Sequence, residues 1–249
     1  MRVFTNMAWP DDPYGTGRQV YRRTQPPMLA AFAVQWVNDG DQALPVSAAM
    51  VYLRLHRTRP VALDPATIQF GFRCVVPEHT DETGQLITTA DLDLLQARRH
   101  AAVLTGHSLL ADLHRLAKAS ALLRRGISAV EADWTQRRTT QRNLAQMIDT
   151  ADTKLAGDDL LHRCLWARIE PHTAAHCLAL PIAFASKHQQ GDPDAQEWLA
   201  LATVEKALIV ALTASRLADR CRWVGRTDIS QLLAATAWDA FPSFAPLPE

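Results

Sequence analysis

The stretch MLAAFAVQWVNDGDQ, residues 28–42, sets the architecture of this chain. An apolar run rich in strand-forming residues meets Asn38-Asp39-Gly40, which is a strong turn signal. The segment PVSAAMVYLRLHR, residues 45–57, follows it with alternating apolar positions at 51, 53 and 55. A third segment, ATIQFGFRCVVPE at 66–78, places Ile68, Phe70 and Phe72 on one face. Three strands joined by short turns predict an antiparallel meander.

The pattern changes to helical spacing after Gly84. The sequence predicts a helix over 88–104 and another over 106–126, with Leu109, Leu113 and Leu116 on one stripe and Gly126 as its stop signal. Residues 144–153 predict a short strand, and residues 158–170, 172–189, 194–223 and 228–241 predict helices. A meander followed by helices and a further strand is an α/β plan with a mixed sheet.

Composition divides the chain into three parts and limits its function. Residues 1–27 predict an irregular N-terminal arm, 28–190 the main domain and 191–249 a helical C-terminal extension. The formal net charge of the 249 residues is +0, so any nucleic-acid role must depend on a local basic patch. The four cysteines form no CxxC pair, and the longest apolar stretch, 199–212, contains Glu205 and Lys206. We therefore expect a cytoplasmic protein in a reducing compartment, with no membrane association.

Three segments carry a family resemblance. They are FAVQW at 32–36, GHSLLADLHRL at 106–116, and Ile148-Asp149-Thr150 followed by LLHRC at 160–164 and HCLALPIA at 176–183. In this order they resemble the signature of DEDDh-type (DnaQ-like) 3′–5′ exonucleases, which is a DxE strand, GHNxxFDxxxL, and an IDT strand before HxAxxDA. The resemblance spans about 28–190. It implies a ribonuclease H-like fold: an α/β mixed sheet flanked by helices, here with a helical C-terminal extension.

The resemblance also implies which residues would form the site. Members of this family hold two divalent metals about 4 Å apart with four carboxylates, and a histidine acts as general base. Carried across, the first-motif acids fall on Ala33 and Gln35, the second-motif acid on Asp112, the base on His176 and the last acid on Pro181. An alternative first strand at 50–56 also lacks DxE. We therefore expect a degenerate site with no metal and no cofactor.

Basic residues concentrate between positions 98 and 142. Within this stretch the candidate nucleic-acid contacts are Arg124, Arg125, Arg137 and Arg138. The alternative is a solvated helical surface neutralised by the acidic stretch 149–159. His172 and His176 have the spacing of a zinc pair, but no further ligands stand at motif spacing.

The sequence thus favours a catalytically degenerate pseudoenzyme that acts as a nucleic-acid-binding or protein-interaction module. One alternative is an active Mg- or Mn-dependent 3′–5′ exonuclease that uses Asp112, His176 and either Asp39 or Asp149. Another is a scaffold whose old cleft binds a partner or small ligand. The expected partners are single-stranded nucleic acid, and a protein or second copy bound through 194–223. The apolar stripe of 194–223 equally fits packing on the domain's own sheet.

Overall fold

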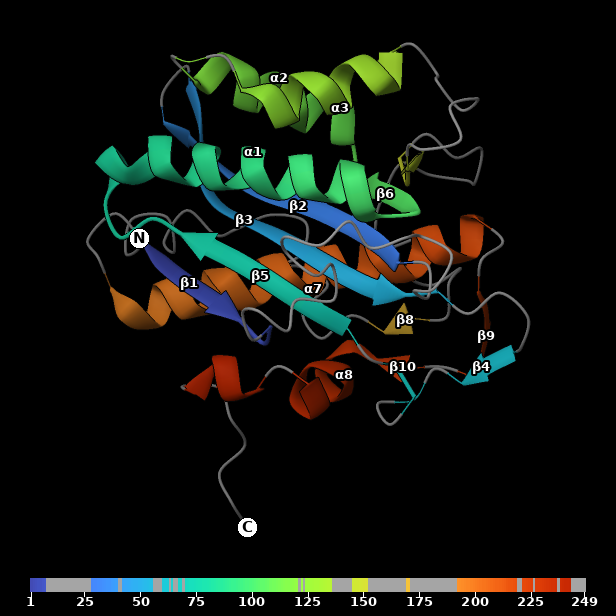
Figure 1. Ribbon diagram of the computed structural model, residues 1–249. Helices are drawn as coiled ribbons and strands as arrows, with labels where there is room; N and C mark the ends of the chain where they lie inside the picture. The colour runs from blue at the N-terminus through green and yellow to red at the C-terminus, as the bar shows by residue number, and fades with distance from the viewer. Residues whose placement is uncertain are drawn as a thin grey trace.

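A computed structural model describes most of the chain (Figure 1). The described residues are 1–7, 28–39, 42–55, 60–62, 64, 67–68, 70–120, 122, 124–135, 145–151, 169–170, 192–218, 221–225, 227–236 and 238–242. The predicted helix at 172–189 lies outside them. The helix predicted at 158–170 is described only at its end, where Ile169–Glu170 form a short strand, β8.

A six-stranded mixed sheet forms the centre of the fold, in the order β1-β5-β3-β2-β6-β7. Its strands are β1 (Arg2–Thr5), β2 (Met28–Asp39), β3 (Gln42–Arg54), β5 (Phe70–Val76), β6 (Val103–Gly106) and β7 (Gln146–Asp149). Strands β1, β5, β3 and β2 pair antiparallel, whereas β6 and β7 run parallel to β2. This confirms the predicted fold class, an α/β, ribonuclease H-like mixed sheet flanked by helices.

The β2–β3 hairpin is the longest pairing in the sheet and follows from the opening stretch of sequence. Asp39 pairs with Gln42, so two residues connect the strands at the predicted turn. The alternation sends Val51 and Leu53 to one core cluster and Tyr52 to the other. A register shift between Gln35 and Trp36 marks a bulge near the end of β2.

Helices α1 (Thr83–His100), α2 (Leu109–Ala119) and α3 (Arg125–Thr135) cover one face of the sheet (Figure 1). The single helix predicted over 106–126 was wrong: Gly106 ends a strand, α2 ends at Ala119 and α3 begins at Arg125. Gly126 lies in the first turn of α3 and does not end a helix. Glycine is required there because a Cβ would lie 1.9 Å from the backbone oxygen of Asp91. Its missing side chain lets α3 approach α1 closely, and the Asp91 carboxylate accepts the N–H of Ile127 at 2.8 Å.

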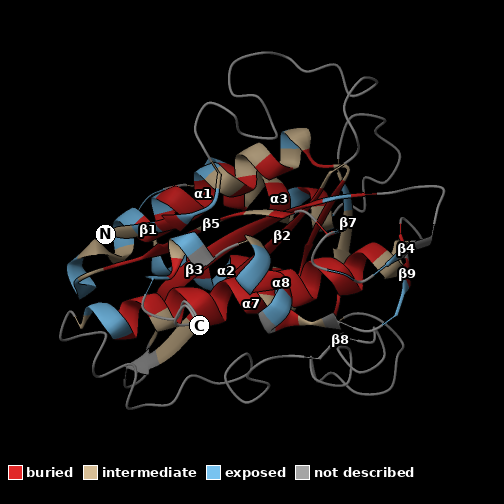
Figure 2. Ribbon diagram, turned by 90° about the horizontal axis from the view of Figure 1, so that it is seen from below, coloured by how far each residue is buried: buried red, intermediate tan, exposed pale blue. Residues whose placement is uncertain are grey.

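Helix α7 (Pro193–Leu217) covers the opposite face of the sheet and is almost wholly buried (Figure 2). The Asp192 carboxylate caps its start by accepting the N–H groups of Asp194 and Ala195. By length and composition α7 alone among the described helices could cross a membrane, yet 89% of its most apolar window is buried inside the protein. The helix that the sequence placed in a C-terminal extension is therefore part of the core. Its apolar stripe packs on the domain's own sheet, which was one of the two alternatives for residues 194–223.

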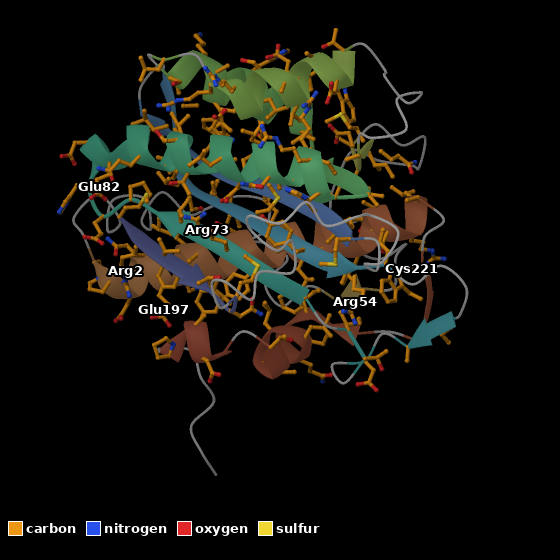
Figure 3. All side chains as sticks on the ribbon, viewed as in Figure 1. Arg2, Arg54, Arg73, Glu82, Glu197 and Cys221 are labelled. Atoms are coloured by element: carbon orange, nitrogen blue, oxygen red, sulfur yellow. The ribbon has the colours of Figure 1, made fainter. Side chains whose placement is uncertain are left out.

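The N-terminal residues also differ from the prediction. Residues 2–5 were expected in an irregular arm, but they form the edge strand β1 against β5. Phe4 stacks on Phe241 with ring centroids 5.6 Å apart, and Phe241 stacks on Phe72 at the same distance. Arg2, labelled in Figure 3, donates to the backbone oxygen of Pro193 at 2.9 Å and so ties β1 to the start of α7. The remainder of the predicted arm, 8–27, lies outside the described residues.

Short elements complete the structure. Strands β4 (Pro60–Ala62) and β9 (Arg222–Val224) pair with each other, as do β8 and β10 (Thr227–Asp228). A 3-10 turn, η1 (Thr80–Glu82), precedes α1, and α8 (Ile229–Thr236) and η2 (Trp238–Ala240) end the described chain. The helix predicted to reach Trp223 ends at Leu217, because Trp223 turns back and its indole N–H donates to Ser215 Oγ at 2.8 Å.

Candidate functional site

The candidate site lies where the parallel strands end. Pairing between β2 and β6 covers only Leu29–Ala31 and Val103–Thr105, and β2 continues to Asp39. The end of β2 therefore extends past its parallel neighbour. In α/β sheets, ligands bind in the crevice beyond the carboxyl ends of such strands. All three segments that carry the family resemblance have residues at this edge.

The second and third of these segments hold each other in place through Asp149. Its carboxylate accepts the N–H groups of Ser108 and Leu109, both at 2.7 Å, and that of Ala151 at 2.9 Å. Ser108 adopts a left-handed conformation with φ 60°, which turns the chain sharply from β6 into α2. A carboxylate at a helix N-terminus satisfies orphan N–H groups and complements the helix dipole. Asp149 thus fixes the start of α2.

That anchoring directs Asp112, in the first turn of α2, towards β2. Its carboxylate is 7% exposed and accepts the indole N–H of Trp36 at 2.9 Å. Burial raises the pKa of Asp112 to about 6, and Asp149 adds to the rise. The charge of Lys206, the Trp36 hydrogen bond and the charge of Arg115 lower the pKa of Asp112 and offset part of that effect.

Lys206 reaches this edge from α7, on the opposite side of the sheet from α2. Its ammonium donates to the backbone oxygen of Val34 at 3.1 Å. Val34 lies between the two positions where the family resemblance places acids. The Arg115 guanidinium lies 5.8 Å from the centre of the Trp36 ring, which is a cation–π contact. The site therefore has two cations beside a single buried carboxylate of α2.

Ala33 and Gln35 occupy the first-motif positions and are buried, at 2% and 5% exposure. Gln35 pairs across the hairpin with Ser47, whose hydroxyl meets that of Thr203 in α7 at 2.5 Å. Because cross-strand partners share a face, Gln35 lies on the α7 side of the sheet, and Thr203 is one helical turn before Lys206. Gln35 Nε2 has no hydrogen-bond partner among the described residues.

Among the residues that the structure describes, the donors at this edge do not fit a two-metal centre. Ala33 offers no ligand, Gln35 offers a neutral amide, and both Asp149 oxygens already accept backbone N–H groups. Within the part of the chain that the structure describes, no group of three or more His, Cys, Asp or Glu is placed to hold a metal. Several predicted site residues lie outside the described residues, namely His172, His176, Pro181, Arg137 and Arg138.

The predicted basic surface is partly neutralised within the helical layer. Arg98 forms a two-pronged ion pair with Asp133, at 2.5 and 3.1 Å, and His114 contacts Glu131 at 2.9 Å. Two acids of α3 therefore act as counter-charges. Most of the acidic stretch 149–159, which the sequence suggested for that role, lies outside the described residues. Arg124 Nε donates to Ser120 Oγ at 2.9 Å. A second group of basic side chains is exposed on α2 and α3, namely Arg115, Lys118 and Arg125.

Two residues of the site were not predicted, Trp36 and Lys206. Trp36 directly follows the first-motif positions, but the bulge after Gln35 turns it towards α2. Glu205 and Lys206 are charged residues within the apolar stretch 199–212. Charged residues in such a stretch are the signal from which a buried polar site could have been predicted.

Comparison with known proteins adds no family assignment. No protein-family model matches the chain, and its sequence matches no curated protein.

Proposed function

We propose that this protein is a degenerate exonuclease-like domain that binds single-stranded nucleic acid without hydrolysing it. The observation that carries the proposal is the charge at the carboxyl end of β2. Two buried carboxylates lie there, but both Asp149 oxygens accept backbone N–H groups, and Asp112 is accompanied by Lys206 and Arg115. A site of this kind suits a phosphate group, whereas two divalent metals require several carboxylates.

The exposed residues beside the site support the same proposal. Arg115 and Lys118 lie one turn apart on the solvent side of α2, and Arg125 starts α3. Phosphate contacts from such side chains supply most of non-specific nucleic-acid affinity. Trp36 is half-buried and has the Arg115 guanidinium over its ring, which combines an aromatic surface with a positive charge of the kind that single-stranded nucleic acids bind. The proposed ligand therefore passes along α2, from the end of β2 towards the start of α3.

Binding is tested by fluorescence anisotropy with labelled single-stranded DNA and RNA of about 20 nucleotides, in EDTA, over a series of salt concentrations. We expect affinity to fall steeply with salt, and the double variant Arg124→Ala/Arg125→Ala to bind more weakly with a salt slope smaller by about 1 to 2. Arg54→Ala is the control, because this exposed arginine ends β3 opposite Met28, at the far end of the β2–β3 hairpin from the site. Absence of binding at low salt would refute the proposal.

Hydrolysis is tested with the same oligonucleotides in Mg²⁺ and in Mn²⁺. We expect no shortening of either strand from its 3′ end. Turnover that disappears in Asp112→Ala would instead support an active exonuclease with a non-standard site. Turnover that persists in that variant would indicate a contaminating nuclease. That nuclease would then be removed by further purification, and the comparison repeated.

A further inference from the structure

The position of Lys206 is unusual for a residue of a core helix. Its neighbours along α7, Glu205 and Ala207, are buried, while Lys206 is half-buried and its ammonium donates to the Val34 carbonyl of β2. Moving an ammonium from water towards a protein interior is costly unless charges or hydrogen bonds compensate it. The Val34 oxygen and the Asp112 charge contribute to that compensation.

The groups around this ammonium favour an anion over a second cation. Asp112 and Asp149 each contribute a negative charge, but both Asp149 oxygens already accept backbone N–H groups, and Arg115 on the same helix as Asp112 adds a positive charge. Ala33 and Gln35 contribute no charge, and Gln35 Nε2 is a buried N–H donor without an acceptor in the described part of the chain. Donors and positive charges bind oxyanions, whereas a divalent metal requires lone pairs and negative charge.

We propose that Lys206 is a built-in cation that replaces the divalent metal of this fold's nucleases and itself binds a nucleotide phosphate oxygen. The inference rests on the proposed nucleic-acid function and specifies its chemistry. An ammonium is a strongly hydrated point charge with three N–H donors, so it binds phosphate without the geometry that Mg²⁺ demands. Phosphate binding at this site is therefore independent of metal.

Calorimetry with thymidine 5′-monophosphate in EDTA tests the first part. We expect Lys206→Met to lower the affinity at least 10-fold, and addition of Mg²⁺ or Mn²⁺ to change wild-type affinity less than 2-fold. Arg54→Met is the control, because it removes one positive charge from an exposed position at the far end of the β2–β3 hairpin, outside the proposed binding surface. Inorganic phosphate in a parallel titration separates recognition of the phosphate group from recognition of the nucleoside.

Two outcomes would overturn the proposal. One is a Lys206→Met protein that binds the mononucleotide as the wild type does. The other is binding that appears only with Mn²⁺ and vanishes in EDTA. Methionine retains most of the length of lysine and its apolar stem, and circular dichroism with a thermal melt checks that each variant is folded.

A metal-binding experiment judges Lys206 separately from any nucleotide. Ala33→Asp/Gln35→Glu restores the two first-motif acids, and Ala33→Asp/Gln35→Glu/Lys206→Met also removes the ammonium. We expect the second variant to bind Mn²⁺, followed by electron paramagnetic resonance, at least 10-fold more tightly than the first. Equal Mn²⁺ affinities in the two folded variants would contradict the replacement of a metal by Lys206.

The two proposals fail in different ways. Oligonucleotide binding that weakens in Arg124→Ala/Arg125→Ala but is unchanged in Lys206→Met retains the proposed function and rejects the role of Lys206. Absence of all oligonucleotide binding rejects the proposed function, while the Mn²⁺ comparison still tests whether Lys206 excludes a metal.

Discussion

Asp112 combines burial with a partial set of compensating interactions. Its carboxylate receives the Trp36 indole hydrogen bond and the attraction of Lys206 and Arg115, yet desolvation remains the largest influence and raises its pKa to about 6. An ionised carboxylate in such a place is costly, so its protonation is linked to folding. The same group lies beside the proposed phosphate site, where its negative charge opposes an anion.

Asp112 therefore predicts a pH dependence of stability. The pKa of this acid in the folded state, about 6, lies above its ordinary value of 3.8, so between these values the folded state binds more protons than the unfolded state. The unfolding free energy that depends on Asp112 consequently falls as pH rises from about 4 through about 6. Urea unfolding from pH 4 to 7 should show Asp112→Asn gaining up to about 3 kcal/mol relative to wild type. A difference that stays constant over this range would contradict the assignment.

The same charge predicts how pH affects ligand binding. Protonation of Asp112 removes a negative charge next to Lys206, so this acid should make mononucleotide affinity increase as pH falls from 7 to 5.5. The phosphate of the mononucleotide also gains a proton in this range. Asp112→Asn should flatten that part of the profile, and a methylphosphonate analogue with a single negative charge over this range separates ligand titration from protein titration. An unchanged profile in Asp112→Asn would show that the pH effect has another source.

At the scale of helices and strands, α2 depends on a carboxylate from the neighbouring strand. Asp149 makes three backbone hydrogen bonds around the start of α2, and its side chain is buried. Asp149→Ala should lower the unfolding free energy by about 2 to 3 kcal/mol, because it leaves buried N–H groups without acceptors. Asp192→Ala, which removes the more exposed cap of α7, should cost about 1 kcal/mol. Equal losses in urea unfolding would argue against the anchoring role of Asp149.

The crossing of α1 and α3 gives a second test at this scale. Gly126→Ala places a methyl group against the Asp91 backbone and should destabilise the protein by about 1 to 3 kcal/mol or more. Gly84→Ala is its control, because a Cβ there meets nothing within 4 Å and alanine favours a helix. Thermal melts of both variants measure the contrast. Similar melting temperatures would show that α3 can move away from α1 at little cost.

Sequence patterns predicted the elements whose hydrophobic periodicity extends over many residues. They failed for short elements and for residues whose role depends on tertiary contacts. The β2–β3 hairpin was evident from alternation and its turn. Strand β6 was missed because Val103–Gly106 is short and lies between helical patterns. Gly126 was misread because glycine serves both helix stops and close helix contacts. At the site, the motif pattern found Asp112, but Lys206 could not be predicted because it depends on how α7 crosses the sheet.

At the scale of the whole molecule, α7 unites the domain. Its buried residues pack on β2, β3 and β5, and the aromatic stack of Phe4, Phe72 and Phe241 joins β1 and β5 to the residue that follows η2. A chain cut after residue 190, at the predicted domain boundary, would expose this apolar face of the sheet. We expect that fragment to be aggregation-prone and to lack a cooperative unfolding transition. A soluble fragment with a sharp melt would show that the boundary at 190 separates independent domains.

The dependence of the sheet on α7 also bears on how the protein is made. The ribosome synthesises the β2–β3 hairpin, its neighbouring strands and helices α1, α2 and α3 before it reaches residues 193–217. Until then, the lower side of the nascent sheet is uncovered and open to association with other chains. Completion of the domain thus waits for late translation, when α7 closes that side and delivers Lys206 to the end of β2.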